Sequence, residues 1–174
     1  HPIDGFWELK HENKGNIYSA TVIVIIVSIS YTITWQYSGF LFNLRNLKNL
    51  NIYFELASIL APFILWCGVN WSLTTLMEGK GTFKEILTVS SYALTPLILI
   101  NVPLTIISNY LTLQEGSFYH FFMILAILWT LILLFLGNLV VHDYTLSKTI
   151  LTSLLTIGGM AFILFISLLF FNLF

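Results

Sequence analysis

Glu55, Asn70 and Asn101 are polar side chains inside otherwise apolar stretches of the sequence. A charged or amide side chain is costly in the hydrocarbon core of a bilayer, so such residues are functional candidates by default. If Glu55 faces the interior of a helical bundle, it can hold a proton or a cation. Pro62 and Asn70 fall roughly on the same helical face at about 100° per residue. Glu55, Asn70 and Asn101 are the candidate intramembrane polar site.

A different interpretation places Glu55 at the membrane surface. A glutamate within one turn of the interface can reach water, and its neighbours Tyr53 and Phe54 are aromatic residues of the kind found at that boundary. We therefore expect the carboxylate of Glu55 to stay hydrated, and we expect its replacement by glutamine to be nearly silent.

Asn101 lies between two prolines, Pro96 and Pro103, that are seven residues apart. Proline removes a backbone hydrogen bond, so this helix should be bent or briefly broken. Interrupted helices with an amide at mid-depth recur in transporters. They also occur as plain packing features, because neighbouring helices satisfy the freed groups. We favour the packing interpretation here.

The segment from Glu78 to Glu85 is the most distinctive polar stretch. It resembles a phosphate-binding loop only superficially, because Lys80 is followed by glycine rather than serine or threonine. Thr82 and Glu85 have the spacing of a capping box, which predicts a helix beginning near Phe83. We expect the lysines to face a partner or an anionic lipid, and the candidate interaction residues here are Glu78, Gly79, Lys80, Gly81 and Lys84.

The residue patterns of common enzymes are missing. His11-Glu12 has no second histidine four residues on, and no GxSxG pattern occurs. His142-Asp143 is a single pair, which we interpret as a solvated cap rather than a metal site. Cys67 is the only cysteine, which excludes a disulfide framework. We therefore expect no catalytic residue, no cofactor and no metal.

The composition defines the elements that position these residues. The chain is 57% hydrophobic and only 9% charged, whereas soluble domains carry about 25% charged residues. A soluble or disordered protein is excluded, and the net charge of −1 argues against a nucleic-acid binder. Five windows lack Asp, Glu, Lys and Arg, and each is long enough for one crossing of a bilayer. The sequence predicts an all-α integral membrane protein, a five-helix bundle with spans at about 17–37, 53–77, 87–111, 118–141 and 149–172.

Residues 1–15 precede the transmembrane domain of residues 16–174. Ile3, Phe6 and Trp7 have helical spacing among charged residues, which fits a short interfacial helix. A frayed lead-in fits equally well. Because the chain begins at His1, we expect it to be a portion of a longer polypeptide or a remnant of an engineered one.

The lysines set the predicted orientation. If the N-terminus is cytoplasmic, the inner side collects Lys10, Lys14, Lys80, Lys84 and Lys148, and the outer side keeps Arg45 and Lys48. Cytoplasmic loops carry an excess of Lys and Arg, so this count predicts an inner N-terminus and an outer C-terminus.

The last span begins with small residues at three- and four-residue spacing. These are Thr149, Thr152, Ser153 and Thr156, followed by Gly158-Gly159. Small residues let helix backbones approach closely. We expect an interhelical contact face, with a pore lining as the second option.

Two motifs resemble the Yip domain family of Ypt-interacting proteins, in its bacterial branch. The first is the lead-in Pro2-Ile3-Asp4-Gly5-Phe6-Trp7, and the second is Tyr92-Ala93-Leu94-Thr95-Pro96, which follows the glycine-bearing loop. Tyr92 and Pro96 join the candidate interaction residues on this ground. The likeness extends over essentially the whole chain.

This resemblance implies a five-helix membrane protein with no established catalytic activity. Eukaryotic relatives act as adaptors in vesicle traffic, and some bacterial relatives are associated with sugar-uptake ABC transporters. Our first hypothesis is a non-enzymatic adaptor or accessory subunit in a bacterial cell membrane, which contacts the bilayer and other membrane proteins such as transporter subunits. Self-association is left open. The alternative is a small transporter or channel that uses Glu55, Asn70 and Asn101.

Overall fold

The computed structural model describes residues 1–12, 14–43 and 51–173, and these residues fold into helices without strands. Five segments of the described chain are long and apolar enough to cross a membrane. The predicted fold class is confirmed. The helices are α1 (Pro2–His11), α2 (Ile17–Tyr37), α3 (Ile52–Leu76), α4 (Phe83–Ala93), α5 (Thr95–Ser108), α6 (Gly116–His142) and α7 (Leu146–Leu173), with a 3₁₀ turn at Leu113–Glu115.

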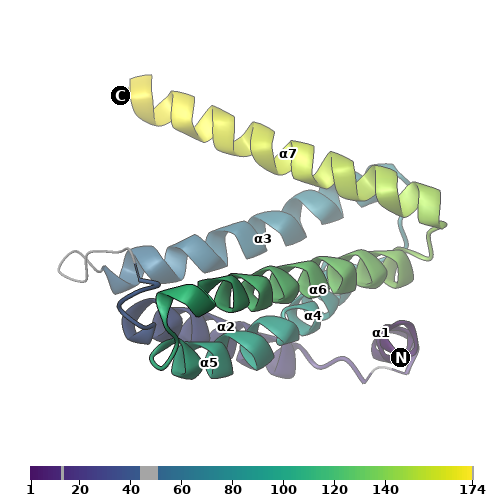
Figure 1. The fold of residues 1–174 in the computed structure, drawn as a ribbon. Coiled ribbons are helices and arrows are strands. Elements are labelled where there is room, and N and C mark those ends of the chain that lie inside the picture. The colour runs from purple at the N-terminus through teal and green to yellow at the C-terminus, as the bar shows by residue number, and fades with distance from the viewer. Residues whose placement is uncertain (13, 44–50, 174) are drawn as a thin grey trace.

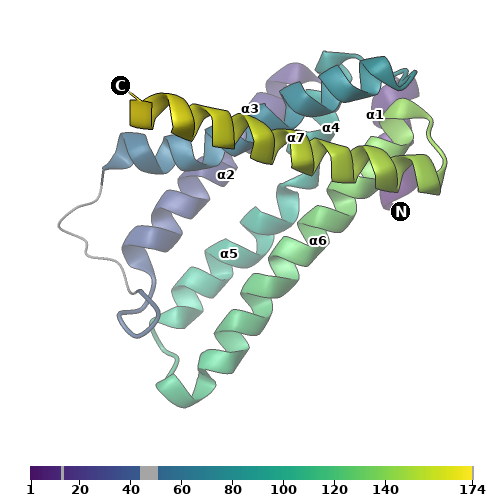
Figure 2. The ribbon, with the colours of Figure 1, turned by 90° about the horizontal axis from the view of Figure 1, so that it is seen from above.

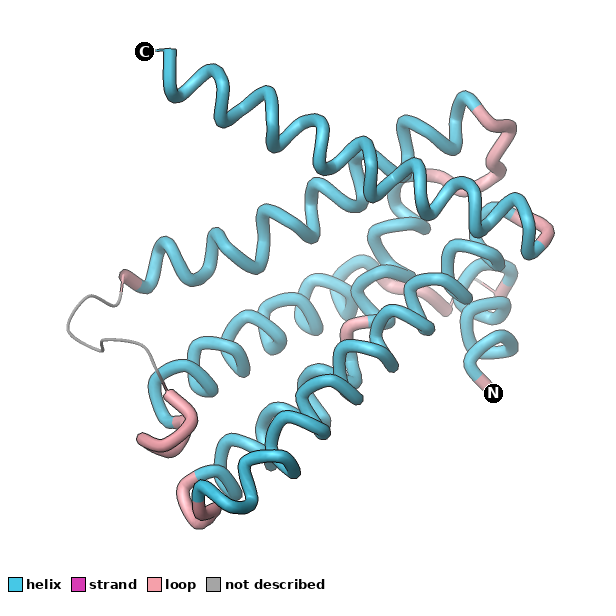
Figure 3. Tube along the Cα trace, turned by 45° about the horizontal axis from the view of Figure 1, so that its top comes forward, coloured by secondary structure: helices cyan, strands magenta, loops and turns pink. Residues whose placement is uncertain are grey.

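The spans run up and down, so the connections gather at two ends of the bundle (Figure 1; Figure 3). One end holds α1, the loop between α3 and α4, and the link between α6 and α7. The two termini lie at opposite ends. The first half of α7 packs on α3, and its second half diverges from the other helices toward the C-terminus (Figure 1). Seen from above, α7 lies in front of α3 (Figure 2). Only 6% of the spanning window of α7 is buried.

The third span is broken, as the prolines predict. Pro96 has no N–H to donate to the carbonyl of Tyr92, one turn earlier. That carbonyl instead accepts the Thr95 hydroxyl at 2.6 Å, and the chain turns at Leu94 between α4 and α5. Pro103 lies inside α5 without ending it. The single break therefore follows from the Thr-Pro pair.

The N-terminal segment does form a helix, α1, which crosses the end of the bundle and is seen nearly end-on in Figure 1. Phe6 is buried in a core that includes Val89 and Val140. Ile3 and Trp7 are about half exposed. The frayed alternative is wrong for residues 2–11, and the interfacial location of this helix stays a prediction.

The small residues of α7 form a contact face, as predicted. The side chains of Thr149, Thr152 and Thr156 are completely buried. A Cβ at Gly159 would lie 2.7 Å from Cγ1 of Val69 in α3, so glycine permits this close approach. Gly158 has open space around it.

Candidate functional site

The loop between α3 and α4 is pressed against the end of α6. A Cβ at Gly79 would lie 2.6 Å from Nδ1 of His142, and one at Gly81 would lie 2.8 Å from Cε1 of the same ring. Glu78 has a φ of 58°, a left-handed conformation that few non-glycine residues adopt. The loop therefore packs closely against α6. Gly79 and Gly81 are needed because a side chain at either position would overlap His142, not because the backbone there requires a conformation that only glycine adopts.

His142 lies at the centre of a buried chain of hydrogen bonds. The N–H of Gly81 donates to Nδ1 of His142 at 3.3 Å, so the proton of the neutral ring sits on Nε2. This Nε2–H donates to Oδ1 of Asn70 at 3.1 Å. Asn70 donates to Asn138 at 3.1 Å, and Asn138 donates to Ser153 at 3.4 Å. The chain joins the loop, α3, α6 and α7.

The prediction that His142-Asp143 forms a solvated cap is wrong for His142 but holds for Asp143. His142 is only 1% exposed, because the loop covers it. Asp143 does end α6, with a left-handed φ of 53°. The two neighbours separate because the last helical residue faces the bundle interior and the next residue leaves it.

Asp143 binds two lysines from different segments. Its carboxylate lies 2.9 Å from Nζ of Lys10 and 3.5 Å from Nζ of Lys80. The hydrogen bond from Lys10 holds the pKa of Asp143 below its usual range. Lys10 also donates to the carbonyl of Val140 at 3.4 Å. This contact fastens α1 to the end of α6, where a cation is favoured by the helix dipole.

We call the surface around Lys10, Lys80, Lys84 and Asp143 the lysine end. The Lys80 side chain is 73% exposed. Glu78 and Lys84 are exposed as well, whereas Gly79 and Gly81 are half-buried against His142. Thr82 and Glu85 form the predicted capping box at the start of α4. Five of the seven candidate interaction residues therefore lie together.

Tyr92 and Pro96 do not reach this surface. Tyr92 packs against the core cluster around Phe6, and Pro96 is almost fully buried. Their place in the motif is explained by the break between α4 and α5. The resemblance named exposed loop residues and buried residues that shape the helix together, and the role of the exposed ones in binding stays a prediction.

The three intramembrane polar residues lie apart, and no hydrogen bond joins them within the described chain. Asn70 belongs to the His142 chain. Asn101 is buried in α5 and interacts with the hydroxyl of Tyr31. Glu55 is only 3% exposed, and within the described residues neither of its carboxylate oxygens has a hydrogen-bond partner. Contrary to the prediction, the carboxylate of Glu55 does not reach the surface of the structure.

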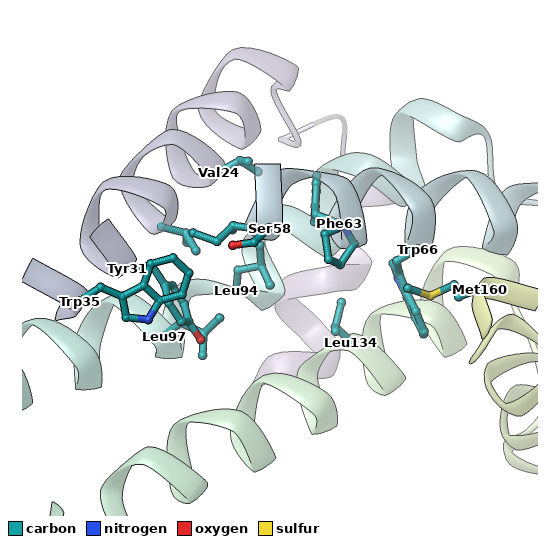
Figure 4. Close-up of a pocket in the computed structure, with 13 residues that line it drawn as sticks. Val24, Tyr31, Trp35, Ser58, Phe63, Trp66, Leu94, Leu97, Leu134 and Met160 are labelled. Atoms are coloured by element: carbon teal, nitrogen blue, oxygen red, sulfur yellow. The ribbon is translucent and has the colours of Figure 1, made fainter. Parts of the chain in front are cut away.

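A cavity of about 370 Å³ lies between α2, α3, α6 and the break after α4. Tyr31 and Trp35 stand at one end of it and Trp66 and Met160 at the other, with Ser58 and Leu94 between them (Figure 4). Sequence reasoning missed this cavity. The only signal is the three- to four-residue spacing of its α2 residues, and a lipid-facing stripe has the same spacing.

This arrangement defines a polytopic α-helical membrane protein whose glycine loop is fixed at one end of the bundle. The chain belongs to the Yip1 domain family, whose model matches residues 1–169, from α1 into the last turns of α7. The family resemblance read from the two motifs is thereby confirmed. No curated protein and no solved structure matches this chain.

Proposed function

We propose that this protein is a non-enzymatic adaptor or accessory subunit that contacts other membrane proteins through the lysine end. The observation that carries the proposal is the fixed geometry of exposed charges. Lys80 and Lys84 project from a segment that buried contacts with His142 hold in place. A surface that is already ordered loses less conformational entropy when it binds. Such a preformed charged surface suits recognition.

Membership of the Yip1 domain family supports a Yip-type membrane protein. We further propose a bacterial cell membrane, with the subunits of an ABC-type sugar importer as the partners. Self-association of the chain is an alternative assembly. Both assemblies predict contacts at the lysine end, so their discrimination rests on which protein is recovered.

The proposed orientation places the lysine end in the cytoplasm and the C-terminus outside. The lysines of the predicted inner side belong to segments that meet at one end of the bundle in Figure 1: α1 and the residues after it, the loop between α3 and α4, and the first turns of α4 and α7 (Lys10, Lys14, Lys80, Lys84 and Lys148). This supports the orientation, because cytoplasmic loops carry an excess of lysine. Arg45 and Lys48, the predicted outer charges, lie outside the described residues. Reporter fusions in the 78–85 loop and at Phe174 should report opposite sides of the membrane, and the same side for both would contradict the five-span topology.

Charge reversal tests the adaptor function. Lys80→Glu with Lys84→Glu should reduce the recovery of co-purifying membrane proteins in mild detergent while leaving membrane insertion unchanged. Lys14→Glu with Lys148→Glu is the matched control, because it changes the charge of the same end equally but leaves the loop intact. Equal recovery by both double variants would contradict a role for the loop.

A small transporter or channel is the second candidate, favoured by the buried carboxylate of Glu55, which has no hydrogen-bond partner among the residues that the structure describes. Asn70 and Asn101 weigh against it, because each interacts with another side chain of the bundle. Purified protein in proteoliposomes tests it. Flux of a solute or ion that Glu55→Gln abolishes would support the transporter, and absence of flux would leave the adaptor as the sole candidate.

A further inference from the structure

The cavity of Figure 4 follows the direction of the helices. On α2 its lining runs from Val24 to Trp35, which is about 16 Å at a rise of about 1.5 Å per residue. On α3 it runs from Ser58 to Trp66, which is about 12 Å by the same rise. Among the residues that the structure describes, no charged side chain lines it. The length and the lining of the cavity fit a single hydrocarbon chain that lies parallel to the spans.

The two ends of the cavity lie at different depths of the spans. Tyr31 and Trp35 stand at one end, close to Tyr37, where α2 ends. Tyr and Trp side chains combine an apolar body with a polar tip, and they concentrate where a membrane meets water. Trp66 and Met160 stand at the other end, near the middle of α3. The cavity therefore has about the depth of one leaflet, which is half of a hydrocarbon core about 30 Å thick.

The cavity is open to the outside of the bundle beside α3. Ser58 and Pro62 in its lining are exposed, and Phe63, Trp66 and Leu134 are half-buried. These residues belong to segments that are long and apolar enough to cross a membrane, so the opening faces hydrocarbon rather than water. Apolar cavities stay dry and take up apolar ligands. The apolar molecules present at this opening are the lipid chains of the bilayer.

We propose that this cavity binds one hydrocarbon chain of a bilayer lipid, in the leaflet that lies away from the lysine end. The chain terminus lies between Trp66 and Met160, and the head group lies at the membrane surface beyond Trp35. An extended chain advances about 1.2 Å per bond, which is a third of the length of an extended residue, so the two walls fit about 10 to 14 carbons. This site is separate from the lysine end and does not depend on the adaptor function.

Quenching of tryptophan fluorescence tests the proposal. Replacement of Trp7, Trp71 and Trp129 by phenylalanine leaves Trp35 and Trp66 as reporters, one at each end of the cavity. The protein is held in micelles of a detergent with a rigid steroid tail, and monoacylglycerols that are brominated at the chain terminus are added. Quenching should saturate, at a mole fraction at least fivefold lower for a chain of about 12 carbons than for one of about 6 or about 18. The shorter chain leaves the cavity partly unfilled, and the longer one exceeds it. Quenching that does not saturate, or that is independent of chain length, would overturn the proposal.

A substitution that fills the cavity locates the site. Ile59→Phe places a larger side chain in the lining and should weaken binding of the 12-carbon lipid at least tenfold. Ile64→Phe is the matched control and should leave the affinity unchanged, because Ile64 is an exposed residue of the same helix that does not line this cavity. Equal affinities of the two variants would contradict the proposed site. The chain-length comparison needs neither substitution, so it decides the proposal even if Ile59→Phe does not fold.

The direction of the bound chain can be tested with the same lipid. In proteins that keep a single tryptophan, the terminal bromine should quench Trp66 more strongly than Trp35. Stronger quenching of Trp35 would contradict a chain terminus between Trp66 and Met160.

Discussion

The buried polar groups at the two ends of the bundle differ in their hydrogen bonding. At the lysine end, the side chains of Asn70, Asn138 and His142 satisfy one another and the loop above them. At the other end, Glu55 is buried as well, and its carboxylate has no hydrogen-bond partner in the described part of the chain. A network whose hydrogen bonds are all satisfied rigidifies the structure around it. A buried polar group without a hydrogen-bond partner is rare and calls for an explanation, such as an ion or a water molecule bound beside it. The polar groups of the first end are therefore fixed by one another, whereas the carboxylate of Glu55 is not fixed by any described side chain.

The largest effect should come from adding a side chain beneath the loop. At Gly81, a Cβ would overlap Cγ1 of Val141, so Gly81→Val should cost about 3 kcal/mol of stability through overpacking. Gly68→Ala is the control, because nothing lies within 4 Å of its Cβ position. Thermal unfolding in detergent should separate the two variants. Equal midpoints would show that the loop is not locked.

A smaller effect should distinguish the polar groups at the two ends. Asn70→Ala leaves His142 and Asn138 without a shared partner and should cost about 2 kcal/mol. Glu55→Gln removes an unpaired charge and should change stability by less than about 0.5 kcal/mol, or raise it. The same unfolding assay measures both. A reversal of this order would contradict the contrast between the ends.

The length and apolarity of the spans could be predicted from the sequence, because the bilayer excludes charge from any segment that crosses it. The break at Thr95-Pro96 and the cap at Thr82 were also predictable, since each is a local hydrogen-bond arrangement. The burial of Glu55 and His142 was not. Spans that are apolar on every side carry no periodic signal of which face meets another helix, so contacts between distant helices stay hidden.

Loss of the Thr95 hydroxyl at the break between α4 and α5 should lower the free energy of unfolding by about 1 kcal/mol. The hydroxyl of Thr95 donates a hydrogen bond to the carbonyl of Tyr92, which Pro96 cannot do because it has no N–H. Thr95→Val removes this hydrogen bond. Thr75→Val is the control. Its hydroxyl also bonds a carbonyl of its own helix, at Trp71, but no proline removes a backbone donor there. Unfolding midpoints should fall for Thr95→Val alone, and equal midpoints would show that the hydroxyl is dispensable.

The smallest effect concerns pH and the docking of α1. The pKa of Asp143 is lowered in the folded state by Lys10, so this contact stabilises the fold above the unfolded-state pKa of about 3.9. The stabilisation should be lost as the pH falls through the lower folded-state pKa. Because the pair is partly exposed, its contribution is below about 1 kcal/mol. Hydrogen exchange in α1 should rise at acid pH in the wild type and be high at all pH values in Asp143→Asn. Identical profiles would exclude this anchor.

Photo-crosslinking from the two ends tests the central claim most directly. A photoreactive residue at Lys80 reports on the lysine end, and one at Tyr53, which is also highly exposed but lies at the other end, serves as the comparison. In intact cells, the account predicts cross-links to other membrane proteins from position 80 and few or none from position 53. Equal cross-linking from both positions, or none from position 80, would contradict the lysine end as a recognition surface.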